Sequence, residues 1–327
     1  MMAPYLPRLL CLCLAAFFVI HTAVGLMVAL IAPYAVRAAQ RMRARRAARF
    51  LLALRLLPAA LGLLLVAGLC VPSYLLLEQE TSAEEVGALC LAAAILGAWI
   101  LRAAMARSLR AITRSIRHAR DWERSGSLSN LSGARQPVCV VDAPAPLLAL
   151  TGLLRPRLVM SRSVASALSA RQLRAALRHE EAHRASHDNL KRLMLMLSPG
   201  LLPGWHGFRT LERGWFRFTE WAADDEAVAG NPRRSLSLAA ALVRIARLGG
   251  TPAPSALSAS FLADGRDLSA RVDRLLRPAM AAPANSAGPM VGASVAACLA
   301  IAGVLVAAAL HPATLQSAHR LMEHLIR

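Results

Sequence analysis

Residues 179–183 read His-Glu-Glu-Ala-His and lie inside the stretch ARQLRAALRHEEAHRASHDNLKRLML, residues 170–195. The stretch is rich in Ala, Leu and Arg, which predicts an α-helix, and Ser169 just before it is a suitable N-cap. Because positions i and i+4 of a helix share one face, His179 and His183 can reach a single Zn2+ ion, with Glu180 beside it as a candidate general base. The alternative explanation is a surface helix in which the two histidines are four residues apart by chance, because the pattern is short.

A catalytic zinc ion usually has three protein ligands, so one more must come from elsewhere in the chain. The segment FTEWAADDEAV, residues 218–228, supplies Glu220 and Asp224 one helical turn apart. We expect Glu220 to ligate the metal and Asp224 to accept an N–H from a zinc-bound imidazole, which fixes the tautomer of that imidazole. Asp225 and Glu226 are weaker candidates, and a solvated acidic face is the alternative to a ligand-bearing helix.

These residues together predict the hydrolysis of a peptide bond. Zinc lowers the pKa of a bound water towards about 7, and Glu180 can take the proton as water attacks and then give it to the leaving amine. A donor that stabilises the oxyanion is also expected, with His187, His206 and Arg213 as candidates. We expect His187 and Asp188 to orient the end of the helix rather than to bind metal.

The composition indicates a membrane protein. Of the 327 residues, 56% are hydrophobic, which is a high share for a soluble chain. The formal net charge of +19 comes almost wholly from arginine, since Lys191 is the only lysine. The arginines are spread along the chain and no run of them alternates with aromatic residues, so we expect no direct nucleic-acid binding. The six cysteines show no CxxC spacing, which argues against a cysteine metal site.

Four apolar stretches are long enough to cross a bilayer, which takes about 20 helical residues. They cover residues 9–35, 51–77, 86–105 and 290–310. Arg55, near one end of the second stretch, is expected to snorkel to the membrane interface. The chain then divides into residues 1–105 with three spans, a soluble domain at 106–288, and residues 289–327 with the fourth span and a short tail.

The loop charges predict the orientation of these spans. Six arginines follow the first span and six follow the third, whereas the charged residues between the second and third spans are all acidic. Since basic loops mark the cytoplasmic side, we expect both termini outside the cell and the soluble domain in the cytoplasm.

The soluble part alternates turn-rich segments with short apolar runs and amphipathic stretches. A basic helix is expected at 107–123 and a loop at 125–135, followed by strands at 138–141, 147–150 and 158–160. Helices are expected at 169–186, 189–197, 208–229, 235–248 and 268–276. The predicted fold class is mainly α: a four-transmembrane-helix protein with a cytoplasmic, zincin-like α+β metallopeptidase domain between spans three and four. The last two strands form either a hairpin whose outer strand pairs with a peptide or an ordinary core hairpin.

Two segments resemble the membrane metallopeptidases of the BlaR/MecR type, the beta-lactam signal transducers of bacteria. They are residues 149–193, with a Gly-then-Arg-Pro hairpin and the histidine helix, and residues 218–228. The SARVDRLL helix near Arg271 and the four-span plan are similar too. The resemblance implies a gluzincin of the bacterial inner membrane that binds zinc through His179, His183 and Glu220, with Glu180 as base. It also implies a transcriptional repressor, or the chain itself, as the substrate.

The sequence departs from that family in two places. The sensors carry a penicillin-binding domain after the last span, whereas this sequence ends at Arg327, so we do not expect this chain alone to sense antibiotics. Glu181 stands where such motifs often have an apolar residue, and we expect only a minor effect. What remains is a membrane peptidase of regulated proteolysis, with a protein substrate and the lipid bilayer as its partners.

Two other functions fit the same residues. A quality-control protease similar to the HtpX type shares the four spans and the His-Glu-x-x-His…Glu arrangement, but it degrades many misfolded membrane proteins. A membrane scaffold or receptor subunit with a vestigial site would bind no stoichiometric zinc.

Overall fold

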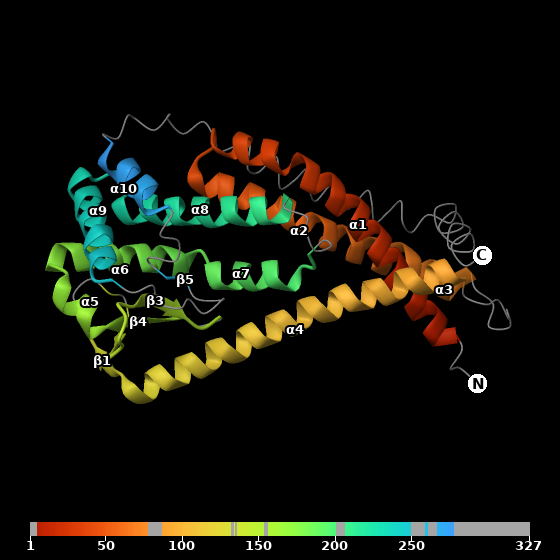
Figure 1. The fold of residues 1–327 in the computed structure, drawn as a ribbon, viewed down its shortest axis with the longest axis horizontal. Coiled ribbons are helices and arrows are strands. Elements are labelled where there is room, and N and C mark those ends of the chain that lie inside the picture. Colours follow the sequence, from red (N-terminus) through yellow and green to blue (C-terminus); the bar gives the residue numbers. More distant parts are fainter. Residues whose placement is uncertain are drawn as a thin grey trace.

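The fold is mostly helical, with one small mixed sheet (Figure 1). The computed structural model describes residues 5–77, 87–131, 134, 136–153, 156–200, 207–249, 259–260 and 267–277. The N-terminal helices are α1 (Tyr5–Ala39), α2 (Ala44–Leu65), a π-helical turn (Val66–Cys70), α3 (Val71–Leu77) and α4 (Ala88–Ser125). The strands are β1 (Ser127–Ser129), β2 (Val138–Val141), β3 (Leu148–Thr151), β4 (Arg157–Ser161) and β5 (Ala259–Ser260). The remaining helices are α5 (Arg162–Ala167), α6 (Ala170–Ala185), α7 (Asp188–Leu197), α8 (Gly207–Val228), α9 (Pro232–Arg247) and α10 (Leu268–Leu276).

Three helical segments are long and apolar enough to cross a membrane, namely Leu6–Ala39, Ala44–Leu76 and Ala88–Ser125. They overlap the first three predicted spans to within two residues at the ends that fall short, and the predicted fourth span at 290–310 lies outside the described residues. At about 1.5 Å per residue, α1 and α4 are each more than about 50 Å long, whereas the hydrocarbon core of a bilayer is about 30 Å thick. Both helices are therefore longer than a span requires, and the basic helix expected at 107–123 is confirmed as the second half of α4.

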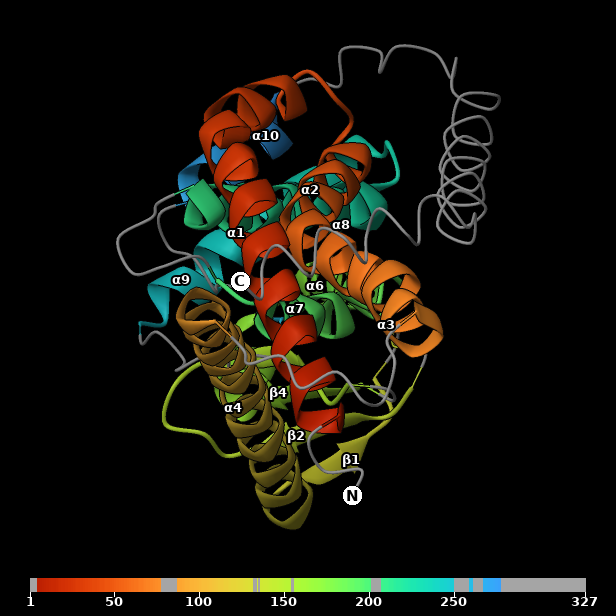
Figure 2. The ribbon, with the colours of Figure 1, turned by 90° about the vertical axis from the view of Figure 1, so that its right-hand side faces the viewer.

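The C-terminal half of α1 and the N-terminal half of α2 pack against α8, which lies alongside both helices (Figures 1 and 2). The buried side chains of this contact include Val28 and Ala32 of α1, Ala47 and Leu51 of α2, and Leu211, Trp215 and Phe218 of α8. Helices long enough to span a membrane thus form one wall of the region that carries the predicted metal ligands.

Arg55 does not snorkel to the interface, which corrects the prediction from its place near the end of a span. The side chain is buried and donates to Glu212 Oε1 on α8 and to Ser198 Oγ at the end of α7, both at 2.8 Å. Its guanidinium also lies 4.2 Å from the ring centroid of Phe208. These partners offset the cost of removing the charge of Arg55 from water. The sequence of α2 alone does not show these partners, so it suggested that the side chain extends to the membrane interface instead.

The sheet has the strand order β1-β2-β4-β3-β5. β3 and β4 form the predicted antiparallel hairpin, and β2 runs parallel to β4. β5 pairs with Ala149 and Leu150 on the outer edge of β3, so this edge already has a neighbour at those two residues. All four residues of β3 are buried, which favours the core hairpin over an edge open to a peptide.

The sheet lies between α6 on one face and the end of α4 on the other. Met160 of β4 belongs to the core with α6 and α9, whereas its neighbour Val159 belongs to a second core that Trp122 of α4 covers. This alternation follows from the pleat, which sends successive side chains to opposite faces. α6 is therefore held between the sheet and α8, with its histidines in the interior.

Gly126 makes the close join between α4 and the sheet possible. A Cβ atom at this position would lie 2.4 Å from Cys139 Sγ and 2.7 Å from the carbonyl oxygen of Trp122. Any other residue would push the end of α4 away from β2, because both neighbours are themselves packed.

The predicted elements of the soluble part are confirmed to within a few residues, with three short exceptions. β1 lies inside the predicted loop at 125–135, and neither α5 nor β5 was expected. These elements have two to six residues, which is too short to show a period in the sequence.

Candidate metal centre

α6 positions the two histidines of the His-Glu-Glu-Ala-His stretch. The helix begins at a capping box in which Ser169 Oγ accepts from the backbone N–H of Gln172, and the side chain of Gln172 accepts from the N–H of Ser169. His179 and His183 lie one turn apart on its buried face, and their Nε2 atoms are 3.1 Å apart. The capped, Ala-rich helix therefore aims both imidazoles at one point.

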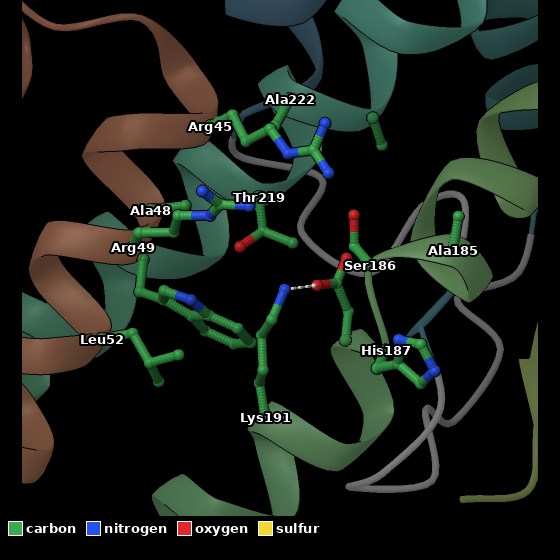
Figure 3. A pocket seen from close by; sticks show the side chains of 13 residues that line it. Arg45, Ala48, Arg49, Leu52, Ala185, Ser186, His187, Lys191, Thr219 and Ala222 are labelled. Atoms are coloured by element: carbon green, nitrogen blue, oxygen red, sulfur yellow. Dashed lines mark hydrogen bonds and ion pairs between the residues drawn. The ribbon is translucent and has the colours of Figure 1, made fainter. Parts of the chain in front are cut away.

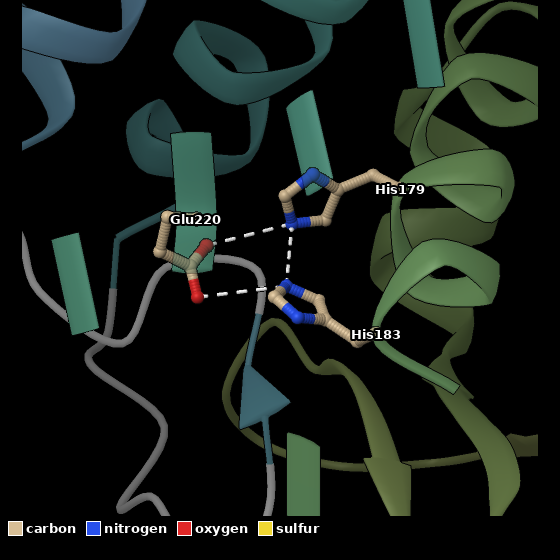
Figure 4. A group of neighbouring side chains, drawn as sticks. All are labelled: His179, His183 and Glu220. Atoms are coloured by element: carbon tan, nitrogen blue, oxygen red, sulfur yellow. Dashed lines mark hydrogen bonds and ion pairs between the residues drawn. The ribbon is translucent and has the colours of Figure 1, made fainter. Parts of the chain in front are cut away.

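α8 brings Glu220 to the same point (Figure 4). Its Oε2 lies 3.5 Å from His179 Nε2, and its Oε1 lies 3.5 Å from His183 Nε2. Among the described residues, these three form a group of side chains that could hold a metal ion. The structure thus brings together the three residues predicted as ligands, from two helices and across about forty residues of sequence.

The spacing of these three side chains fits a zinc ion. Tetrahedral ligands at about 2.0–2.1 Å from zinc are about 3.3–3.4 Å apart, and the observed separations are 3.1, 3.5 and 3.5 Å. Two imidazoles and one carboxylate are also a common ligand set of catalytic zinc. The two 3.5 Å distances go to different oxygens of Glu220, and one ligand atom from each of the three residues lies within 4.8 Å of the others.

Each histidine has a carboxylate on its far nitrogen. Asp224 Oδ1 lies 2.9 Å from His179 Nδ1, and Asp188 Oδ2 lies 2.8 Å from His183 Nδ1. An ionised carboxylate only accepts hydrogen bonds, so each Nδ1 carries a proton. Each Nε2 faces the other and Glu220, and a metal ion bound between them would take the place of any proton on these two atoms.

Asp188 is a site residue that the sequence reasoning missed. It was expected to orient the end of the helix, whereas its carboxylate accepts from both His183 and Lys191, the latter at 2.7 Å. The chain can turn back here because His187 adopts a left-handed conformation, with φ of 54°, between α6 and α7. A carboxylate at the first position of the next helix, five residues after the second histidine, is the signal that could have found it.

Glu180 is buried between the metal group and the sheet. Only 1% of it is exposed, and neither carboxylate oxygen has a hydrogen-bond partner among the described residues. Burial raises the pKa of Glu180 to about 7, although the two neighbouring histidines act in the opposite direction. It also lines a small pocket with Leu150 of β3 and Leu158 of β4. A carboxyl group of this pKa can both accept and release a proton near neutral pH.

Arg271 on α10 completes the charge balance of the site. It donates to both oxygens of Asp224, at 2.9 and 2.7 Å, and its Nη1 lies 3.0 Å from Glu220 Oε2. Burial alone would raise the pKa of Glu220, but His183 and Arg271 hold it well below its usual value. Glu220 is therefore ionised, as a metal ligand must be.

Two of the three candidates for stabilising an oxyanion lie on the surface, and the third is untested. His187 and Arg213 are exposed, and His206 lies outside the described residues. The buried arginines near Glu220 are instead Arg271 and Arg192, whose Nη2 lies 3.9 Å from Glu220 Oε1. The signal for Arg271 was its place on the apolar face of an amphipathic helix, among leucines and a valine.

The fold and the site together define a class of protein. It is a mostly helical chain with helices able to cross a membrane and a buried His-His-Glu group able to hold one metal ion. No protein-family model matches the chain, and no curated protein matches it either.

Proposed function

We propose that this protein is a membrane-bound zinc endopeptidase that hydrolyses peptide bonds of protein substrates. One observation carries the proposal. Three donor atoms from His179, His183 and Glu220 converge from two helices, next to a buried Glu180 whose oxygens have no partner among the described residues. Structural zinc sites are closed by four protein ligands, whereas the group found among the described residues has three, as catalytic zinc sites do.

The residues divide the chemistry as follows. When bound, Zn2+ supplies Lewis acidity that polarises a peptide carbonyl and acidifies the attacking water. Glu180 accepts the proton of that water and then donates it to the leaving amine. Asp224 and Asp188 hold the two imidazoles in the tautomer that leaves Nε2 free for the metal. Arg271 keeps Glu220 and Asp224 ionised and fixes their orientation.

The proposal includes an orientation in the bacterial inner membrane. The arginines after the first and third spans favour a cytoplasmic catalytic domain with both termini outside. A fourth span at 290–310 would return the chain to the outside. Three described helices long enough to cross a bilayer support the membrane location itself.

The resemblance to the BlaR/MecR type favours regulated proteolysis. On this proposal the substrate is a protein of the cytoplasm or the membrane, with a transcriptional repressor or the chain itself as the first candidates. The resemblance covers about half of the chain and includes every residue of the proposed centre.

Glu180→Gln tests the mechanism. We expect the variant purified in detergent to keep one zinc ion per chain and to lose hydrolysis of an unfolded test protein such as casein by about 100-fold or more, because general-base catalysis contributes that much. Glu181→Gln is the matched control, since Glu181 pairs with Arg184 on the outer side of the same helix. Cleavage by Glu180→Gln at the wild-type rate would exclude the proposed base, and wild-type protein without zinc would exclude the metal centre.

Proteins trapped on Glu180→Gln in membranes then separate the kinds of peptidase. A regulator retains one partner, whereas a quality-control protease retains many unrelated membrane proteins. A scaffold with a vestigial site would differ from both, because neither zinc nor cleavage would be found in the wild type.

A further inference from the structure

A second site lies close to the candidate metal centre, in a pocket of about 260 Å³ (Figure 3). The first turns of α2, the turn between α6 and α7, and the middle of α8 form its walls. The pocket is slightly smaller than those that take drug-sized ligands, so its size suits a small ion or a headgroup.

Positive charge dominates this pocket. Arg45 and Arg49 lie one turn apart on α2, and no acidic group among the described residues pairs with either. Lys191 enters from α7. The acid in the lining is Asp188, which Lys191 shares with His183. Three cations around one such carboxylate leave a positive excess, which would attract an anion.

A buried hydroxyl also faces the pocket. Thr219 of α8 is 5% exposed, and its Oγ1 has no partner among the described residues. Figure 3 shows the hydroxyl directed into the space between the α2 arginines and Lys191. An unpaired hydroxyl at this depth costs about 1–3 kcal/mol, so a bound acceptor would stabilise it.

We propose that this pocket binds a phosphate group, supplied either by free phosphate or by the headgroup of an anionic phospholipid. Two guanidinium groups, one ammonium group and one hydroxyl match the several acceptor oxygens of phosphate, and arginine forks suit its geometry. The lipid source is chemically available because α2 belongs to a segment long enough to span the membrane. Peptidase activity is not needed for this binding.

Binding to the zinc-loaded full chain tests the site. In the first arm, protein in discs of phosphatidylcholine is titrated with inorganic phosphate, at an ionic strength held constant with chloride, and the heat of binding is measured. In the second arm, native mass spectrometry counts phosphatidylglycerol retained by detergent-solubilised protein, against phosphatidylcholine. We expect saturable binding in at least one arm, and that arm identifies the source.

The variants decide whether the pocket itself is responsible. Arg45→Gln with Arg49→Gln should weaken binding by about tenfold or more, and Thr219→Val should weaken it by a smaller factor. Arg41→Gln with Arg46→Gln is the matched control, because these exposed arginines of the same region do not line the pocket. Equal weakening by both double variants would overturn the proposal in favour of a diffuse basic surface, and so would the absence of binding in both arms. Unchanged zinc content shows that each variant has folded.

Discussion

The charge arrangement around the two imidazoles decides what this centre can hold. Glu220, Asp224 and Asp188 surround His179 and His183 at 2.8–3.5 Å, with Arg271 behind two of the carboxylates. Burial disfavours a charged His183, yet Glu220 and Asp188 raise its pKa to about 10. The protein without metal therefore holds a proton where the metal-bound protein would hold Zn2+, since binding requires the neutral imidazole.

Asp188→Asn is expected to weaken zinc binding by about 10- to 100-fold, the usual effect of losing a carboxylate behind a ligating histidine. The amide oxygen of asparagine can still accept a hydrogen bond from His183 Nδ1. The change therefore removes the negative charge of residue 188 and keeps its hydrogen bond to His183. Competition with a chromophoric chelator measures the affinity. Asp225→Asn is the control, because Asp225 is an exposed carboxylate that pairs with Arg274 instead. Equal affinity of the two variants would contradict the role of Asp188.

Sequence reasoning found the residues whose spacing is local. One helix carries His179, Glu180 and His183 within about one turn, and a second helix carries Glu220 and Asp224 one turn apart. Helical geometry alone therefore predicts which side chains lie together within each helix. It missed Asp188 and Arg271 as neighbours of the histidines, because their roles arise only when α7 and α10 fold back against α6 and α8. A buried arginine on an amphipathic helix is ordinarily assigned to the surface, and only its acidic partners show otherwise.

At the scale of helices and strands, end signals were enough to locate most elements. Ser169 caps α6 as predicted. The start of α9 was predicted at residue 235 and lies at Pro232, because the N-cap Asn231 and Pro232 in the first turn were not recognised as a start signal. The pairing of elements was harder to predict. β5 lies along β3 although more than a hundred residues separate them, and no local pattern encodes this contact.

The bond from Arg55 to Glu212 adds to the apolar contact between α2 and α8. Replacing Arg55 by Met should lower the free energy of unfolding by about 2 kcal/mol, because Glu212 and Ser198 lose a charged donor in a part-buried place. Thermal unfolding in detergent measures the loss. Arg213→Met changes an exposed arginine of α8 and should have little effect. If Arg55→Met were as stable as wild type, the ion pair would not hold these helices together.

At the scale of the whole molecule, hydropathy located the three described spans because bilayer thickness imposes a length on them. It did not show that the end of α1 and the start of α2 pack on α8. In the most apolar windows of these two segments, 33% and 28% of the residues are buried inside the protein. Small apolar residues such as Ala32 and Ala47 occur both in lipid-facing helices and in packed helix contacts. Composition therefore cannot distinguish a residue that faces lipid from one that packs on α8.

Thiol labelling can test the proposed orientation. In a background without the six native cysteines, Ser127→Cys places an exposed thiol just after α4. A membrane-impermeant reagent should label it in inside-out vesicles and not in intact cells. Ser82→Cys, between the second and third predicted spans, should show the opposite pattern. Labelling of residue 127 from outside would reverse the topology and place the peptidase away from cytoplasmic substrates.

α4 is an unbroken rod of 38 residues, joined at Gly126 to the sheet that supports α6. A rod of about 57 Å acts as a lever: a tilt of about 5° at one end moves the other end by about 5 Å. A change in bilayer thickness that tilted α4 would therefore move the strands next to Gly126 by more than the 3.1–3.5 Å that separate the proposed ligand atoms.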